Sequence, residues 1–170
     1  MKIAITDACI FIDLHDLNLT VSFFSIDLEL YTSLDVLNEL YPEQRNVLDA
    51  FVSVGKLTIH TIASAERIEI MNTNYPRALS EVDKTVLFLA KKHEAIVLSS
   101  DKVIRNHAKK VAIEYHGMLW IFDQLIEQGI LSKKEASEKL KELIQQNVMY
   151  QNNSKLMKEF EGRLMDWEDN

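Results

Sequence analysis

Two aspartates directly follow apolar runs, at places where burial of an acidic side chain costs stability unless something compensates for its charge. Asp7 follows Lys2–Thr6 and Asp101 follows Ile96–Ser100, and each run is typical of a buried strand. An aspartate at the end of such a strand faces solvent, caps the next helix or binds a cation. Neighbouring parallel strands would bring the two carboxylates close together, so the pair indicates a shared site more strongly than either residue does alone.

Two further acids could join them. Glu39 lies between Leu37 and Leu40 in a largely apolar helical segment, and Asp83 lies in the first turn of a helix that begins after Ser80. Taken singly, Glu39 is a solvated helix position and Asp83 is an anion favoured by the helix macrodipole. Three or four converging carboxylates repel one another and are tolerated mainly when divalent cations neutralise them. Hard oxygen ligands select Mg²⁺ or Mn²⁺, ions that polarise a phosphate and activate water for in-line attack.

The elements that must position these acids alternate along the chain. Strands are predicted at residues 2–6, 56–62, 95–99 and 111–116. Helices are predicted at residues 8–18, 63–72, 101–110, 118–128 and 132–146, with others beginning near Asp35 and after Ser80. Residues 20–31 show no clean alternation, and Leu30–Leu34 could be a strand. This order predicts an α/β fold with a largely parallel sheet, in which functional groups gather at the carboxyl ends of the strands.

Length and composition bound the class of protein. The chain has 170 residues, 47% hydrophobic and 26% charged, which suits one packed domain. With only 4 Gly and 2 Pro, neither a turn-rich sandwich nor a phosphate-cradling glycine loop is expected. The single cysteine, Cys9, excludes an internal disulfide framework and a Cys-rich zinc site, and the five histidines share no metal-ligand spacing. No apolar run reaches the ~18 residues of a membrane span and no signal peptide is evident, so we expect a cytoplasmic protein.

The net charge of −7 is unevenly distributed. Residues 1–50 carry two basic and nine acidic side chains, whereas residues 91–110 carry six basic and two acidic ones. An acidic total argues against a protein that coats nucleic acid electrostatically, but not against an enzyme that binds a phosphodiester through metal ions. Lys102 and Arg105 follow Asp101 on one predicted helix, where they form either a solvated face or a phosphate-contacting rim beside the metal site.

In order and spacing, several strings resemble the successive motifs of PIN-domain ribonucleases. They are ITDACIFIDL, LDVLNEL, SEVDKTVLFLA and AIVLSSDKVIRNHAKK, the last followed by VAIEYHG, and the resemblance runs from about residue 2 to residue 146. It implies a three-layer α/β/α fold with a central parallel sheet, extra C-terminal helices, and three or four acids around Mg²⁺ or Mn²⁺. On this basis residues 1–146 form a PIN-like nuclease domain, and residues 147–170 are a C-terminal helical extension or tail.

Carried over residue by residue, the resemblance assigns the metal ligands and catalytic acids to Asp7, Glu39, Asp83 and Asp101. Asp83 is preferred over Glu81 because it lies seven residues before Ala90, the register in which the family's acid precedes its alanine, and Glu81 remains its rival. Ser99 falls where the family often has a small hydroxyl residue, two positions before the acid. Thr6 neighbours the first acid and is a candidate to support it.

The activity implied by the resemblance is metal-dependent endoribonuclease cleavage, in which a water activated by Mg²⁺ or Mn²⁺ attacks an RNA phosphodiester. Many small bacterial members of the family resemble toxins of toxin–antitoxin pairs, so a small antitoxin and a homodimer are expected partners. Two alternatives stay open. One is a non-catalytic PIN-like scaffold that binds a protein through its C-terminal helices. The other is a structure-specific DNA nuclease of related fold, whose usual DNA-gripping insertions are not evident in this chain.

Overall fold

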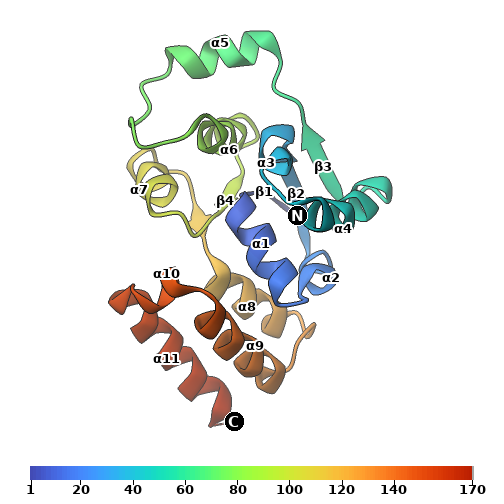
Figure 1. The fold of residues 1–170 in the computed structure, drawn as a ribbon, viewed down its shortest axis with the longest axis vertical. Helices are drawn as coiled ribbons and strands as arrows, with labels where there is room; N and C mark the ends of the chain where they lie inside the picture. The colour runs from blue at the N-terminus through green and yellow to red at the C-terminus, as the bar shows by residue number, and fades with distance from the viewer. Residues whose placement is uncertain (170) are drawn as a thin grey trace.

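A five-stranded, all-parallel sheet forms the centre of the protein, and acidic residues follow its strands at the carboxyl edge. The computed structural model describes residues 1–169. The strand order is β3-β2-β1-β4-β5, and every pairing is parallel (Figure 1). The strands are β1 (Lys2–Thr6), β2 (Leu28–Ser33), β3 (Leu57–His60), β4 (Ile96–Leu98) and β5 (Tyr115–His116). The predicted α/β class with a parallel sheet is therefore confirmed.

Helices flank the sheet and continue beyond it. The first eight are α1 (Ala8–Asp16), α2 (Thr20–Phe23), α3 (Leu34–Asn38), α4 (Pro42–Ser53), α5 (Ser64–Asn72), α6 (Glu81–Lys92), α7 (Lys102–Lys110) and α8 (Met118–Glu127). They are followed by α9 (Lys133–Gln146), α10 (Val148–Gln151) and α11 (Ser154–Glu168). Helix α6 packs on β1, β2 and β4 and against α3, whereas α8, α9, α10 and α11 form a layer of helices at the lower end of the molecule (Figure 1). No helix among residues 1–169 combines the length and apolar character that a membrane crossing requires.

Several helix ends follow directly from the local sequence. Ser80 and Ser132 begin α6 and α9 through capping boxes, in which each serine side chain accepts a bond from a backbone N–H three residues later. Gly55 and Gly129, with φ of +73° and +69°, lie just past α4 and α8 in the left-handed conformation that glycine adopts without strain. The predicted starts of the helices after Ser80 and at residue 132, and the predicted end of the helix at residue 128, agree with these caps to within one residue.

Other boundaries differ from the prediction. Strand β2 begins at Leu28 rather than Leu30, and the cap of the next helix is Ser33, whose Oγ accepts from the Val36 N–H at 3.1 Å, rather than Asp35. In the first part of β2, Leu28 and Tyr31 are only half-buried and Glu29 is exposed, so the start of this strand is hard to predict from the sequence. The last strand is only two residues long, because it lies at the sheet edge and pairs with β4 alone.

The segment after residue 146 is helical and packed as far as the structure describes it. Phe160 and Trp167 of α11 are buried, with 1% and 7% of their surface exposed. The Arg163 guanidinium forms a two-pronged ion pair with Asp123 of α8, at 2.9 Å for its shortest contacts. Lys141 and Glu168 link α9 to α11. The described part of residues 147–170 thus forms the two helices α10 and α11, and Asn170 lies outside the described residues; the division of the chain at residue 146 stays a prediction.

We expect Phe160→Ala to lower the free energy of unfolding by about 3 to 5 kcal/mol, because it removes a buried aromatic ring and leaves a cavity. Urea denaturation followed by circular dichroism measures the change. Met165→Ala on the same helix is the matched control, since Met165 is 65% exposed and should lose less than about 0.5 kcal/mol. Equal, small losses for both variants would mean that α11 is not part of the folded core.

Candidate metal centre

Asp7 lies at the junction of β1 and α1, and hydrogen bonds reach both oxygens of its carboxylate. The residue is 5% exposed, and its backbone N–H donates to the Leu98 carbonyl at 3.0 Å, which extends the pairing of β1 with β4 by one residue. Its Oδ1 accepts from the Ala8 N–H at 2.8 Å. Its Oδ2 accepts from the Ser99 hydroxyl at 2.8 Å and from the Cys9 thiol at 3.3 Å. These contacts fix the orientation of the carboxylate.

Ser99 connects Asp7 to the β4–α7 loop (residues 99–101). The fully buried Ser99 hydroxyl donates to Asp7 and accepts from the Asp101 N–H at 3.1 Å. The Ser99 carbonyl in turn accepts from Arg105 Nη1 at 3.2 Å, while the Arg105 guanidinium lies over the Tyr115 ring at 5.0 Å. The predicted hydroxyl at position 99 thus has a role that is visible here: it sets both aspartates relative to the sheet.

Asp101 is a helix cap and also keeps one oxygen available. Its Oδ1 accepts from the backbone N–H groups of Val103 and Ile104 at 2.8 and 3.0 Å, which caps α7. Within residues 1–169, its Oδ2 has no such bond. The capping role and a role in the site are therefore compatible.

Two hydroxyls bring the segments of Glu39 and Asp83 together. Ser33, the cap of α3, lies 2.8 Å from the Thr85 hydroxyl of α6. Because the Thr85 hydroxyl donates to the Val82 carbonyl at 2.6 Å, Ser33 is the donor in this pair. Glu39 ends α3 and Asp83 lies two residues before Thr85, so this buried contact places both acids at the carboxyl edge of the sheet.

The electrostatics show that three of the acids act on one another. Burial raises the pKa of the Asp7 carboxyl above its usual range; hydrogen bonds from Ser99, Cys9 and Ala8 oppose this rise, and the charge of Asp83 adds to it. Glu39 is exposed as a residue, yet burial of its carboxyl raises its pKa most, followed by the charges of Asp7 and Asp83. Glu81, the rival of Asp83, instead pairs with Lys84 at 2.7 Å on the surface.

The donor set fits a hard divalent cation in its chemistry, although the side chains are not gathered around one point. Among residues 1–169, no three His, Cys, Asp or Glu side chains are close enough to hold an ion as they stand, and none of the four acids pairs with Lys, Arg or His. Asp83 uses one oxygen to accept from the Ser80 N–H at 3.0 Å and keeps the other. The Thr6 hydroxyl, next to Asp7, is buried without a partner in this part of the chain. Repelling carboxylates with no cationic neighbour are what a bound cation relieves.

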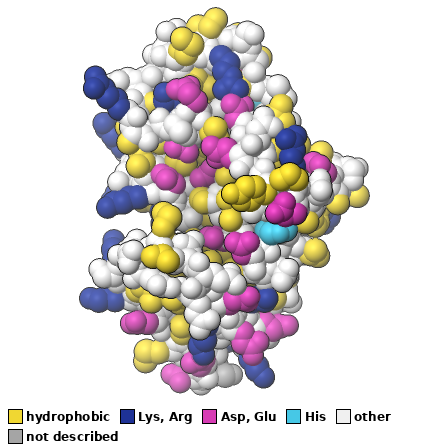
Figure 2. All heavy atoms as spheres, in the orientation of Figure 1, with side chains coloured by type: hydrophobic (Ala, Val, Ile, Leu, Met, Phe, Trp, Pro, Cys, Tyr) yellow, Lys and Arg dark blue, Asp and Glu magenta, His cyan; other side chains and the backbone are white. Residues whose placement is uncertain are grey.

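Acidic and basic side chains gather in separate parts of the surface. Figure 2 shows acidic side chains gathered between α6 and the first turn of α1, and Lys and Arg side chains along the edge beside α7. Lys102 is exposed at the first turn of α7, whereas Arg105 is half-buried and already holds Ser99 and Tyr115. Of the two predicted phosphate contacts, Lys102 is therefore the one with a free ammonium group among the described contacts.

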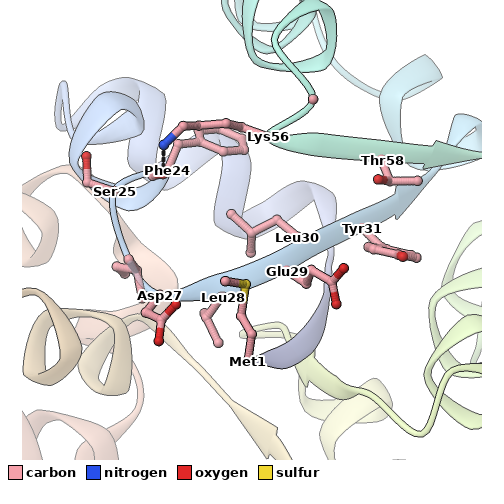
Figure 3. A pocket seen from close by; sticks show the side chains of 12 residues that line it. Met1, Phe24, Ser25, Asp27, Leu28, Glu29, Leu30, Tyr31, Lys56 and Thr58 are labelled. Atoms are coloured by element: carbon pink, nitrogen blue, oxygen red, sulfur yellow. Dashed lines mark hydrogen bonds between the residues drawn. The ribbon is translucent and has the colours of Figure 1, made fainter.

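Cys9 serves the site as a hydrogen-bond donor only, and a pocket elsewhere in the protein lies away from the acids. Burial, then the charge of Asp7, raises the pKa of the Cys9 thiol to about 12, so it stays protonated and serves as a donor. A pocket of about 400 Å³ lies at the amino end of β2, where Glu29 and Tyr31 extend from one side of the strand and Lys56 bonds to the Phe24 carbonyl (Figure 3). It opens at the end of the sheet opposite to the acids.

Gly117 is required by the Arg105 guanidinium. A Cβ atom at position 117 would lie 2.6 Å from Arg105 Nη1, so Gly117→Ala should push the guanidinium away from Ser99 and Tyr115. We expect a loss of about 1 to 2 kcal/mol, the sum of one hydrogen bond and one cation–π contact. Gly162→Ala is the control, because a Cβ there meets nothing within 4 Å and alanine favours a helix by about 1 kcal/mol. Urea denaturation of both variants makes the comparison, and equal stabilities would contradict the role of Arg105.

Asp7→Asn should stabilise the metal-free protein. Since the pKa of Asp7 is raised above its ordinary value of 3.8, the folded chain holds this proton more tightly than the unfolded chain. Stability therefore falls as the pH rises above 3.8 through the raised folded pKa, and the uncharged Asn escapes this loss. In EDTA at neutral pH we expect its melting temperature to exceed that of the wild type by a few degrees, a difference that closes at acid pH. A lower melting temperature at neutral pH would show that the charge is already compensated.

The comparisons with known proteins identify the family of this chain. The family model described as PIN domain matches residues 3–160. Among curated proteins none matches. One solved structure, a domain of a functionally unknown protein from Methanocaldococcus jannaschii DSM 2661, is 22% identical with a TM-score of 0.48, covering 69% of this chain and 91% of that chain, a likeness too low to carry an argument. The family match spans most of the sequence, so this chain belongs to the PIN-domain family, whose members are typically nucleases and commonly bind divalent metal ions.

Proposed function

We propose that this protein is a metal-dependent endoribonuclease whose site is the carboxylate group of Asp7, Glu39, Asp83 and Asp101. The observation that carries the proposal is the buried Asp7 carboxylate, whose pKa is raised by burial and by Asp83 and which has no Lys, Arg or His partner among residues 1–169. Membership of a family of typical nucleases supports the same reading. The scaffold alternative accounts for Asp7 as the cap of α1, but not for the repulsion between Asp7 and Asp83.

Each residue has a defined task in this proposal. Asp7, Glu39 and Asp83 would hold one or two Mg²⁺ or Mn²⁺ ions, which supply Lewis-acid polarisation of the phosphate and an activated water. Ser99 keeps the Asp7 oxygens oriented, and the free Asp101 oxygen lies where it can accept a hydrogen bond from water. The exposed Lys102 ammonium, next along the chain, is suited to a phosphate oxygen of the RNA backbone.

The basic edge beside α7 gives the direction in which a nucleic acid would lie. Lys102, Lys109 and Lys110 are exposed on α7, and Figure 2 shows Lys and Arg side chains along that edge, next to the acidic centre. Phosphate contacts of this kind position a chain without reading its sequence. An antitoxin that covers the acidic centre, and a homodimer, remain proposals that follow from the family resemblance alone.

Purified protein should cleave mixed RNA in Mn²⁺ or Mg²⁺ and lose this activity in EDTA. Asp7→Asn should lower the rate by more than about 100-fold, since even residues that only support a metal ligand typically contribute 10–100-fold. Asp49→Asn is the matched control, because Asp49 is exposed on α4 and away from the site, and should cleave at the wild-type rate. Gel electrophoresis of end-labelled RNA measures the rates.

Two results would count against the nuclease proposal. Cleavage that persists unchanged in Asp7→Asn would point to a contaminating enzyme. Folded wild-type protein, free of any co-purified partner, that neither cleaves RNA nor gains thermal stability from Mn²⁺ would favour the scaffold alternative, because a ligand that binds only the folded state must raise its stability.

A further inference from the structure

A second buried acid, Asp13, lies on the same helix as Asp7 and has a different partner. Asp13 is 7% exposed in α1, and its Oδ2 accepts from the Tyr150 hydroxyl at 2.6 Å. Its Oδ1 accepts from the Asn147 side-chain amide at 3.3 Å. Both donors belong to the segment at α10, more than 130 residues away in sequence. Hydrogen bonds to an ionised carboxylate are the stronger kind, so this cluster ties α1 firmly to α10.

Tyr150 is itself rigidly placed. The residue is 5% exposed, and its ring packs edge-on against Phe160 of α11, with 5.6 Å between ring centroids. Asn147 also caps α10, through a bond from the Met149 N–H at 3.1 Å. The donors that reach Asp13 are therefore supported by the C-terminal helices and do not depend on a mobile side chain.

Helix α1 also contacts the β4–α7 loop. Ser100 donates to the Cys9 sulfur from its hydroxyl at 3.3 Å and from its N–H at 3.4 Å. The Cys9 thiol in turn donates to the Asp7 carboxylate at 3.3 Å. The helix that Tyr150 holds at Asp13 therefore also carries the residue that joins this loop to Asp7.

We propose that Tyr150 is a positioning residue for the acidic centre: by holding α1 at Asp13, it fixes how Asp7 is presented between β1 and the β4–α7 loop. This inference rests on the proposed function, since it assigns the C-terminal helices to the site of that function. It gives residues 147–168 a role in binding the cation, in place of a separate role as a tail or an arm for a partner.

The test uses full-length protein and compares Tyr150→Phe with Tyr41→Phe. The first change removes only the buried hydroxyl and keeps the ring against Phe160, whereas Tyr41 is 69% exposed and serves as the matched control. Mn²⁺ binding is measured by isothermal titration calorimetry, and kcat and KM are measured separately on a short RNA. We expect Tyr150→Phe to weaken Mn²⁺ binding and to lower kcat by about tenfold, with KM nearly unchanged, as for loss of a residue that orients a ligand.

A second variant separates positioning from folding. Asn147→Ser keeps a good cap for α10 but cannot reach Asp13, so it should give the same pattern with a smaller effect, even if Tyr150→Phe fails to fold. Hydrogen exchange of the Ser100 and Asp101 N–H groups, which bond to Cys9 and Ser99, should quicken in both variants.

The outcomes distinguish the two proposals. Variants that lose stability while keeping wild-type Mn²⁺ affinity and kcat would overturn the role of Tyr150 and leave the nuclease proposal standing. Wild-type protein that neither binds Mn²⁺ nor cleaves RNA would overturn both.

Discussion

A carboxylate buried at the end of the central strand is the constraint on which the rest of this structure depends. Asp7 exchanges its hydration for bonds from Ala8, Ser99 and Cys9, and these bonds do not outweigh burial, because its pKa remains raised. Capping of α1 offsets only part of the cost of burying this charge. The surrounding residues are arranged to hold it in place: Ser99 is fixed through its carbonyl by Arg105, and Arg105 fits only because position 117 has no side chain.

The topology explains how acids from distant parts of the sequence come to one edge. Strand β1 is central, with β2 on one side and β4 on the other, so the segments that follow these three parallel strands begin beside one another. Asp7 follows β1, Glu39 ends the helix after β2, and Asp101 follows β4. Asp83 arrives by a different route, on α6, and the hydroxyl pair of Ser33 and Thr85 joins that helix to the end of β2.

Features that depend on neighbouring residues could be predicted from the sequence, whereas contacts between residues far apart in the sequence could not. The positions of Asp7 and Asp101 at the ends of strands were predictable, because an acid after an apolar run is a local pattern. The caps at Ser80 and Ser132 were predictable for the same reason. Strand β2 was predicted only in part, because its first residues are exposed or half-buried and give a weak pattern. Nothing local indicated that Arg105 would hold the Ser99 carbonyl. The contact of Asp13 with Tyr150 joins residues 137 positions apart and has no sequence signature.

Helix α1 connects the C-terminal helices with the acidic centre. A buried acid, Asp7, caps this helix of nine residues, and a second, Asp13, lies in its second half. At its N-terminus the macrodipole and the first N–H groups favour the Asp7 charge, but Asp13 lies toward the C-terminus, where the macrodipole opposes a negative charge. Burial raises the pKa of Asp13 as well, and Tyr150 and Asn147 lower it again. The charge that the local helix disfavours is therefore stabilised by donors from α10, within the range matched by the PIN-domain family. A helix that depends on the C-terminal segment at one end and presents Asp7 at the other couples the two regions directly.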